Sequence, residues 1–269
     1  MCRQADSHVL SDHYFPAVVQ DELCQRVVSE PDVTKRSLVR GASLSSFSAD
    51  AFFVVIQGAV AVELLGDDGE LTTLEVLVPG DCAPNWPESK PPTHQIGLRA
   101  MVPSSVARVP LTTFARVMQS DPALASAFGS KLAQQHTELL ARLAETVQRS
   151  ALRRVSAAVG YLAQKLGLGC PLASGIRIPL PQSEIANVAN HTRQTTNDAM
   201  RQLQAAGLVR LERSMVCVLD RERLGAIAQG ADLQPTWEPA KTCQFTDPDE
   251  VLTCYPLRRA SPALGTGSG

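Results

Sequence analysis

Residues 182–209 read QSEIANVANHTRQTTNDAMRQLQAAGLV and carry the most informative pattern in the chain. Its apolar spacing predicts a short helix over residues 182–189, a tight turn, and a longer helix that Gly207 ends. Asn190 suits the left-handed position after the first helix, and Thr192 is a natural N-cap for the second. The pattern is typical of a helix–turn–helix, whose second helix enters the major groove of DNA.

The second helix of this pair has an apolar side and a polar side. The side expected to be buried carries Thr196, Ala199, Met200 and Leu203. The polar side offers donors and acceptors suited to reading bases, at Arg193, Gln194 and Asn197. Phosphate contacts are expected from Thr192, Thr195, Arg201, Arg210 and Arg213. An ordinary helical hairpin inside a core is the alternative interpretation of such a pattern.

The residues on either side of the helix pair support a winged DNA-binding domain over residues 151–231. Residues 151–166 have the apolar period of a core helix. Residues 208–212 and 215–219 form a predicted β-hairpin, and Asp220 is expected to cap a last helix. This segment carries ten Lys or Arg against five Asp or Glu, although the whole chain has a net charge of −2. A basic block suits a polyanionic partner, and chance clustering of charges is the alternative.

The first part of the chain has a different pattern of apolar and turn-forming residues. Residues 16–30 are weakly helical. From residue 37 to residue 110, short β-rich runs alternate with Gly and Asp turns at intervals of about ten residues, which predicts an antiparallel sandwich or roll. A short helix capped by Thr112 or Thr113 follows. We therefore expect a β-roll domain with an N-terminal helix over residues 1–119.

A long helix is predicted over residues 120–150, with Asp121 as N-cap and Pro122 in the first position. One apolar stripe runs along it, formed by Leu124, Phe128, Leu132, Leu139, Leu143 and Val147. We expect this stripe to pack partly along its own sheet and mainly against a second copy of the helix. Residues 232–269 are rich in Pro and Gly and are interpreted as an irregular or disordered tail.

Composition bounds the class of protein. The chain has 269 residues, of which 44% are hydrophobic, so it can bury a core. It contains no apolar run of the roughly 20 residues that a membrane helix needs, and it begins without a signal-peptide core. The seven cysteines include no C-x-x-C pair, so no metal site is predicted and the thiols are expected to be free. A cytoplasmic protein without a membrane partner is the expectation.

The residues from Glu184 through Ala206-Gly207-Leu208-Val209 to Leu224 resemble the winged helix–turn–helix of the CRP/FNR superfamily of bacterial transcription regulators. The front half agrees, because Gly58, Gly69 and Pro79-Gly80-Asp81 are similar to the glycine pattern of that family's cyclic-nucleotide-binding β-roll. The resemblance covers about residues 16–230. It implies an α+β fold with an N-terminal antiparallel, jelly-roll-like β-roll, a long dimerisation helix and a C-terminal winged helix–turn–helix. It also implies a homodimer that binds a near-palindromic operator on double-stranded DNA and contacts RNA polymerase.

The departures from the family bear on the effector. Members that bind cyclic AMP place Gly-Glu and Arg-Ser or Arg-Thr pairs where this chain has Pro84-Asn85 and His94-Gln95. A buried phosphate needs a guanidinium or a nest of N–H groups, so ordinary cyclic-nucleotide binding is not expected. The cysteine cluster of the iron–sulfur branch is absent from the sequence. Asn197-Asp198 stand where the family often has a second base-reading arginine, which predicts a different operator.

Two residues form a possible effector site, Cys82 and His94. Cys82 lies near the place where the family's haem-based carbon monoxide sensors have a cysteine ligand, and a thiolate can bind haem iron. The alternative function is therefore a haem- or thiol-based gas or redox sensor that uses Cys82. The plainer interpretation is a small buried thiol and a surface histidine, with no cofactor and with the effector unknown.

An enzyme built on a cupin-like roll is a remote alternative. It would need clustered metal ligands, whereas the five histidines are dispersed and make no such motif in the roll. Hydrolase, nucleotide-phosphate and zinc-protease motifs are also missing from the sequence. We expect no catalytic residues and a protein that is not an enzyme.

Overall fold

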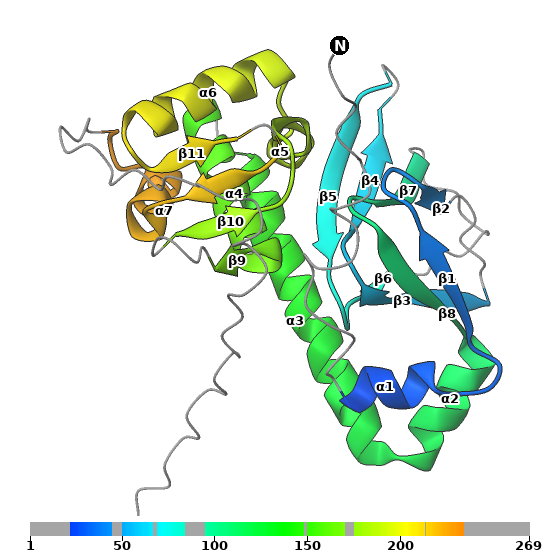
Figure 1. Cartoon of the computed structure of the whole chain (residues 1–269). Helices are drawn as coiled ribbons and strands as arrows, with labels where there is room; N and C mark the ends of the chain where they lie inside the picture. Colours follow the sequence, from blue (N-terminus) through cyan, green and yellow to red (C-terminus); the bar gives the residue numbers. More distant parts are fainter. Residues whose placement is uncertain are drawn as a thin grey trace, which may run out of the picture.

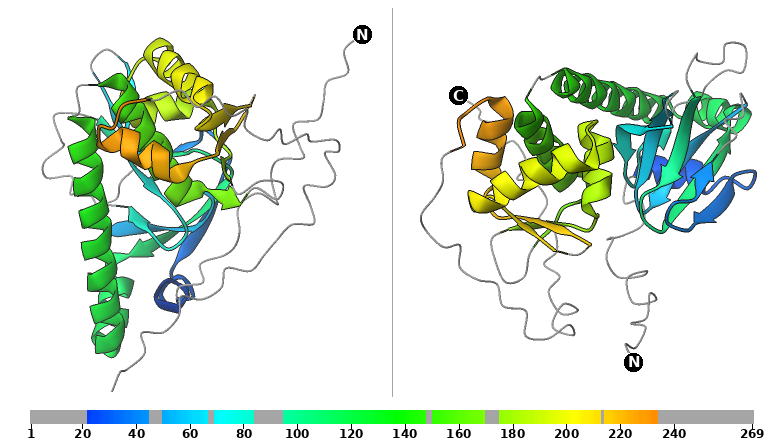
Figure 2. Two further views of the ribbon diagram at one scale, coloured as in Figure 1. Left: turned by 90° about the vertical axis from the view of Figure 1, so that its left-hand side faces the viewer. Right: turned by 90° about the horizontal axis from the view of Figure 1, so that it is seen from above.

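The computed structural model describes residues 22–44, 50–66, 69–83, 95–147, 150–169, 175–212 and 214–233. They form a β-roll and a helical domain, and one long helix joins the two (Figure 1). The two views of Figure 2 show this helix running along the roll to the helical domain. None of the described helices is long and apolar enough to cross a membrane.

The roll consists of two four-stranded antiparallel sheets. The first has the order β1 (Thr34–Leu38), β8 (Ser104–Pro110), β3 (Ala51–Gln57) and β6 (Cys82–Ala83). The second has the order β2 (Ser43–Leu44), β7 (Gln95–Ala100), β4 (Val60–Leu65) and β5 (Leu71–Leu77). The predicted antiparallel roll is confirmed.

Alternation along the strands divides the apolar residues of the roll between three cores. Phe53 and Val55 of β3 point between the sheets, into the core that also contains Leu77 and Leu98. Their neighbours Phe52 and Val54 point outward, under α1 (Glu22–Val28), α2 (Leu111–Ser120) and the first part of α3 (Pro122–Thr146). The outer face of the second sheet joins a third core, which it shares with the helical domain.

The caps of the helices decide where α2 and α3 begin. Asp121 accepts hydrogen bonds from the N–H groups of Ala123 and Leu124, and Pro122 follows it, as the sequence predicts for α3. The expectation that Thr112 or Thr113 caps α2 is wrong. The N-cap position is Pro110, the last residue of β8, and Thr113 is buried with its hydroxyl donating to Asp32.

The helical domain has the predicted winged topology and one additional hairpin. Its elements are α4 (Ala151–Leu166), β9 (Leu168–Gly169), β10 (Ile176–Ile178), α5 (Gln182–Ala189), α6 (Arg193–Ala205), β11 (Val209–Leu211), β12 (Val216–Val218) and α7 (Arg221–Gln229). The predicted wing is the antiparallel pair β11 and β12, and Asp220 caps α7 by accepting from the N–H of Arg223. Strands β9 and β10, which were not predicted from the sequence, extend the sheet beyond β12.

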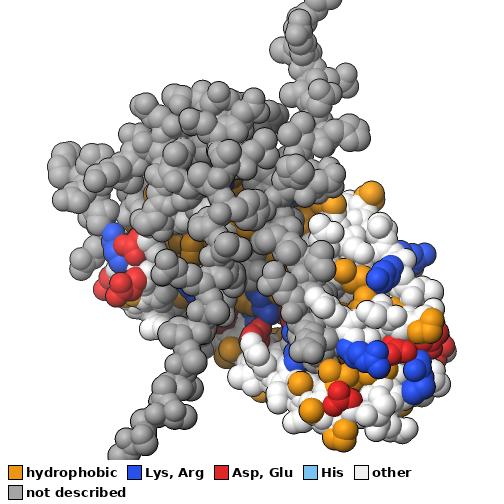
Figure 3. Space-filling view, turned by 60° about the horizontal axis from the view of Figure 1, so that its bottom comes forward, with side chains coloured by type: hydrophobic (Ala, Val, Ile, Leu, Met, Phe, Trp, Pro, Cys, Tyr) orange, Lys and Arg blue, Asp and Glu red, His pale blue; other side chains and the backbone are white. Residues whose placement is uncertain are grey.

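Charges of both signs are mixed on the roll. Arg116 forms ion pairs with Glu30 at 3.0 Å and with Asp32 at 3.5 Å. On the face shown in Figure 3, Lys and Arg side chains of the described residues lie beside Asp and Glu side chains. Exposed ion pairs of this kind contribute little to stability, so the roll depends on its apolar cores.

Gly58, between β3 and β4, gives a stability prediction. Its φ is +86°, and a Cβ there would approach the side chain of Ser104 and lie 2.6 Å from the carbonyl oxygen of Pro103. We expect Gly58→Ala to lower the free energy of unfolding by about 2–5 kcal/mol, because backbone strain and overpacking both act. Gly69 has a φ of +80° but open space around it, so Gly69→Ala should cost only about 1–2 kcal/mol. Equal losses in urea denaturation of the two variants would contradict this account.

Candidate nucleic-acid interface

The turn between α5 and α6 has the geometry of a helix–turn–helix. Helix α5 ends at Asn190, whose φ of 50° is the only positive φ among the described residues other than glycine. Two residues later Thr192 caps α6, and its hydroxyl accepts the N–H of Thr195 at 3.2 Å. The chain therefore reverses direction within one short turn, and both turn residues have the conformations that the sequence predicts.

Arg154 of α4 stabilises this turn by binding its carbonyl oxygens. Its guanidinium donates to the carbonyl oxygen of Ala189 at 2.9 Å and to that of Asn190. These carbonyls follow the last turn of α5 and have no partner within the helix, so a cation is well placed there. Burial, together with nearby Arg154, lowers the pKa of His191 in the same turn. Arg154 was not predicted from the sequence, because its contacts span 35 and 36 residues of chain.

Helix α6 buries one side and leaves the other open. Thr196, Ala199, Met200 and Leu203 are buried against the domain core, as predicted. Arg193, Gln194 and Asn197 are exposed on the opposite side, together with Thr192 and Arg201. Thr195 is half-buried, with its hydroxyl 2.9 Å from that of Thr192. A capped helix thus presents a row of polar side chains to solvent, with its positive dipole end at Thr192.

The wing lies beside this helix in the sequence and contacts it in the structure. Arg210 is on β11, which packs against α6, and it is half-buried. Arg213, the other predicted phosphate contact of the wing, lies outside the described residues. Figure 1 shows α6 and the β11–β12 hairpin on the outer side of the helical domain, away from α3. The predicted base-reading residues are therefore exposed on α6, and Arg210 lies on the wing strand that contacts this helix.

The stripe along α3 is divided by the structure. Leu124 and Phe128 pack against the outer core of the first sheet, and Leu139 is half-buried. Leu132, Leu143 and Val147 are exposed, and Val147 is 78% exposed. The buried residues of α3 are polar, Gln135 and Arg142. The helix therefore meets its own subunit with apolar residues in its first turns and with Gln135 and Arg142 further on, while Leu140, Leu143 and Val147 are exposed.

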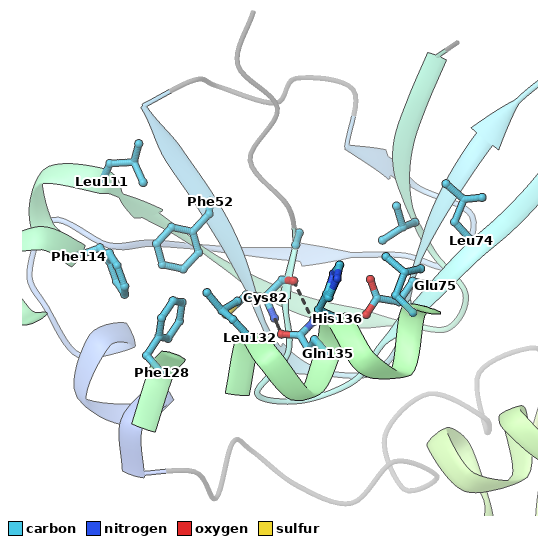
Figure 4. A pocket seen from close by; sticks show the side chains of 13 residues that line it. Phe52, Leu74, Glu75, Cys82, Leu111, Phe114, Phe128, Leu132, Gln135 and His136 are labelled. Atoms are coloured by element: carbon cyan, nitrogen blue, oxygen red, sulfur yellow. Dashed lines mark hydrogen bonds between the residues drawn. The ribbon is translucent and has the colours of Figure 1, made fainter. Parts of the chain in front are cut away.

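A cavity of about 370 Å³ lies between α3 and the roll (Figure 4). Phe52, Phe114 and Phe128 surround one end, with ring centroids 4.6 to 6.1 Å apart. Glu75 and His136 lie toward the other end. Burial raises the pKa of Glu75, and a long hydrogen bond from Gln135 opposes this shift. The cavity therefore has an aromatic end and a polar end.

Cys82 lines this cavity, whereas His94 lies outside the described residues. Gln135 accepts the N–H of Cys82 at 3.1 Å and donates to its carbonyl oxygen at 3.2 Å, which ties β6 to α3. The structure thus brings Cys82 together with Glu75, Gln135 and His136, which were not predicted from the sequence. Sequence spacing gave no signal for them, because β5, β6 and α3 are far apart along the chain.

The comparisons with known proteins agree with this geometry. Residues 140–227 match the family model of the Crp-like helix–turn–helix domain. No curated protein matches the sequence. Among solved structures, a CooA mutant from Carboxydothermus hydrogenoformans has a TM-score of 0.62 at 20% identity, over 79% of this chain and 98% of that one.

Two further structures have the same fold. FixK2 from Bradyrhizobium japonicum has a TM-score of 0.60 at 18% identity, over 74% of this chain and 99% of that one. A CRP-family transcriptional regulator from Thermus thermophilus has a TM-score of 0.59 at 22% identity, over 75% of this chain and all of that one. The superfamily resemblance is confirmed: the chain has a Crp-like helix–turn–helix domain and the overall fold of CRP/FNR regulators.

Proposed function

We propose that this chain, with its Crp-like domain and CRP/FNR fold, is a homodimeric regulator of transcription that binds a specific, near-palindromic DNA sequence. The observation that carries the proposal is the open polar side of α6, where Arg193, Gln194 and Asn197 project from a helix capped by Thr192. In the alternative interpretation, a helical hairpin inside a core, these side chains would be buried. Their exposure beside a hairpin wing is what a helix that enters a DNA groove requires.

The chemistry of the three exposed side chains suggests how bases are read. The planar guanidinium of Arg193 suits the O6 and N7 atoms of guanine, and the amide of Gln194 suits the N6 and N7 atoms of adenine. Asn197 lies one turn further along the helix and would reach the neighbouring base. Thr192, Thr195, Arg201, Arg210 and Arg213 would bind phosphates and fix the register of the helix on the duplex.

Pairing of two α3 helices would place two such surfaces on one face of a dimer. Leu140 and Leu143 are 53% and 42% exposed, which is unusual for large apolar side chains along one helix. A second copy of the same helix is the partner that would cover them, as an isologous contact. The two recognition helices would then face successive major grooves about 34 Å apart.

The cavity beside α3 is the candidate effector site. Its described lining contains no Lys or Arg, which argues against a bound phosphate and hence against ordinary cyclic-nucleotide binding. An effector there would touch the helix that pairs the subunits and would shift the balance between dimer orientations. RNA polymerase is the further protein partner that we propose, in the cytoplasm where the DNA is.

A second candidate function is gas or redox sensing through Cys82. The observation that favours it is that Cys82 and His136 line the same largely apolar cavity, so a thiolate and an imidazole are available to one group. If haem bound there, it would supply iron that binds a gas or changes oxidation state. The cupin-like enzyme would require clustered metal ligands, and in the described part of the chain no group of three His, Cys, Asp or Glu residues could hold a metal ion.

Base reading by Arg193 is tested by Arg193→Ala. We expect this change to cost about 1–3 kcal/mol on an operator selected from random DNA, because one bidentate contact to a base is lost. Binding to unrelated duplexes should change little. Arg36→Ala, at an exposed position on β1 of the roll, is the control and should bind normally. Fluorescence anisotropy measures both affinities, and an equal loss on unrelated DNA would contradict base reading.

Dimerisation through α3 is tested by two glutamates on opposite sides of the helix. Leu143→Glu places a charge in the exposed apolar stripe and should yield monomers, because an unpaired charge would be buried on pairing. Ala141→Glu lies two residues away, on nearly the opposite side of the helix, and should leave a dimer. Light scattering of the purified proteins gives the mass. A dimer of Leu143→Glu, or a monomeric parent protein, would overturn this arrangement.

The second candidate is tested by an absorption spectrum of the protein purified without added cofactor, in air and after dithionite. Haem bound by Cys82 should give a Soret band that shifts on reduction and changes in Cys82→Ser. Cys217→Ser is the matched control, because Cys217 is also buried but lies on β12 in the wing. A featureless spectrum from cells supplied with haem precursor would rule out haem sensing through Cys82.

A further inference from the structure

The two domains of one subunit meet on the outer face of the second sheet. Ala61 and Val76 point outward from β4 and β5 and share a core with Ile185 and Val188 of α5. In Figure 1 and in the right-hand view of Figure 2, α5 lies beside the β5 edge of this sheet. The helical domain is therefore seated on the roll through its first helix of the helix–turn–helix pair.

Three charged side chains meet in this contact, and we call them the Arg99 cluster: the buried Glu63 and Glu184 and the largely buried Arg99. Arg99 Nε and Nη2 donate to the two oxygens of Glu63 at 2.9 and 2.6 Å. Arg99 Nη1 and Nη2 donate to the two oxygens of Glu184 at 3.0 and 2.8 Å. The side chains are 14%, 6% and 8% exposed, respectively. One planar guanidinium thus binds two carboxylates, each in a bidentate manner.

The strand pattern explains why the cluster forms at this point. Side chains alternate between the two faces of a sheet, so Glu63 shares the outer face with Ala61 of the same strand. Arg99 lies opposite Ala61 in the β4–β7 register and diagonal to Glu63, within reach of a long side chain. Glu63 and Arg99 belong to the roll, whereas Glu184 is in the first turn of α5. One carboxylate therefore anchors Arg99 in the roll and the other connects it to the helical domain.

Two neutral hydrogen bonds accompany this ionic contact. The N–H of Val76 donates to the hydroxyl of Tyr161 at 2.9 Å, and the hydroxyl of Thr72 donates to the side-chain oxygen of Asn190 at 3.2 Å. Asn190 is the turn residue between α5 and α6. The contact with the roll thus includes both the first helix and the turn that set the direction of α6.

We propose that Arg99 is a positioning residue for DNA recognition: by binding Glu63 and Glu184 together, it fixes α5 on the roll and thereby fixes the orientation of α6. The proposal rests on the proposed DNA-binding function. With α5 docked on the roll, Arg193, Gln194 and Asn197 are exposed, so these side chains are accessible to DNA. A buried ion pair is a weak source of stability, but its geometry selects one arrangement among many apolar contacts of similar energy. Two half-sites at a fixed spacing require that selection.

The test compares two isosteric changes that each remove one carboxylate from Arg99. Glu184→Gln removes the charge that joins the domains, and Glu63→Gln removes the charge inside the roll. Arg99 keeps one charged partner in both variants. The loss of folding stability that comes from removing one carboxylate should therefore be similar in the two. We expect Glu184→Gln to weaken binding to the selected operator about tenfold, the effect of losing a charged hydrogen bond. Glu63→Gln should bind within about twofold of the parent on the same scale.

A second measurement is how the binding affinity depends on the spacing of the two half-sites. A general loss of stability would not change this dependence. The parent protein should bind its operator more tightly than the same half-sites moved apart by one base pair. In Glu184→Gln this preference should fall about tenfold, because α6 is no longer held in one orientation. Glu63→Gln should keep the preference. Equal behaviour of the two variants would overturn the positioning role.

Hydrogen exchange on the full-length protein tests the contact without DNA. The amides of β5 and α5, including that of Val76, should exchange faster in Glu184→Gln than in Glu63→Gln, because the interface opens more often. If Glu184→Gln is poorly folded, Glu184→Asp shortens the same contact and carries the same expectation. A parent protein without specific DNA binding would refute the proposed function. Unchanged exchange in both Glu184 variants would refute the domain contact itself.

Discussion

Strands of the roll are covered on both faces, and this two-sided burial organises the rest of the molecule. In β3, Phe53 and Val55 fill the space between the sheets, while Phe52 and Val54 receive α1, α2 and the start of α3. In β4, Val60 and Val62 point inward and Ala61 points toward the helical domain. Each sheet therefore has an outer face with apolar residues that are covered, in one sheet by helices of the roll and in the other by the helical domain.

Helix α3 connects these two covered faces. In its first turns Leu124 and Phe128 pack against the roll, and further along Gln135 binds the backbone of Cys82 and Arg142 lies over the ring of Tyr161. Lys165 of α4 reaches Glu138 at 2.6 Å and Asp81 at 3.4 Å, so the roll, α3 and α4 share one ionic network. Leu140, Leu143 and Val147 of its second half remain exposed.

The same arrangement places the cavity next to the contact between the roll and the helical domain. The cavity wall includes β5, β6 and α3, and β5 also carries the contact with α5. A ligand that moved β5 or α3 would act on elements that touch the helical domain directly, without a separate relay. A ligand shifts the population of two conformations only as far as it binds them with different affinity.

Local sequence determined most of the helices and the ends of several of them. Asp121, Thr192 and Asp220 cap helices where they stand, and Asn190 takes a left-handed conformation, because these preferences are set by each residue and its nearest neighbours. The periodicity of residues 182–209 likewise determined which side of α6 is buried. The short strands β9 and β10 were missed, since segments of two or three residues are too short to show a period.

Which distant residues meet was determined by the tertiary structure. The apolar stripe of α3 was divided by what the roll could cover, and Gln135 and His136 reached the cavity beside Cys82. Arg99 met Glu184 across 85 residues because pleat, register and domain packing, which no local spacing encodes, brought them together.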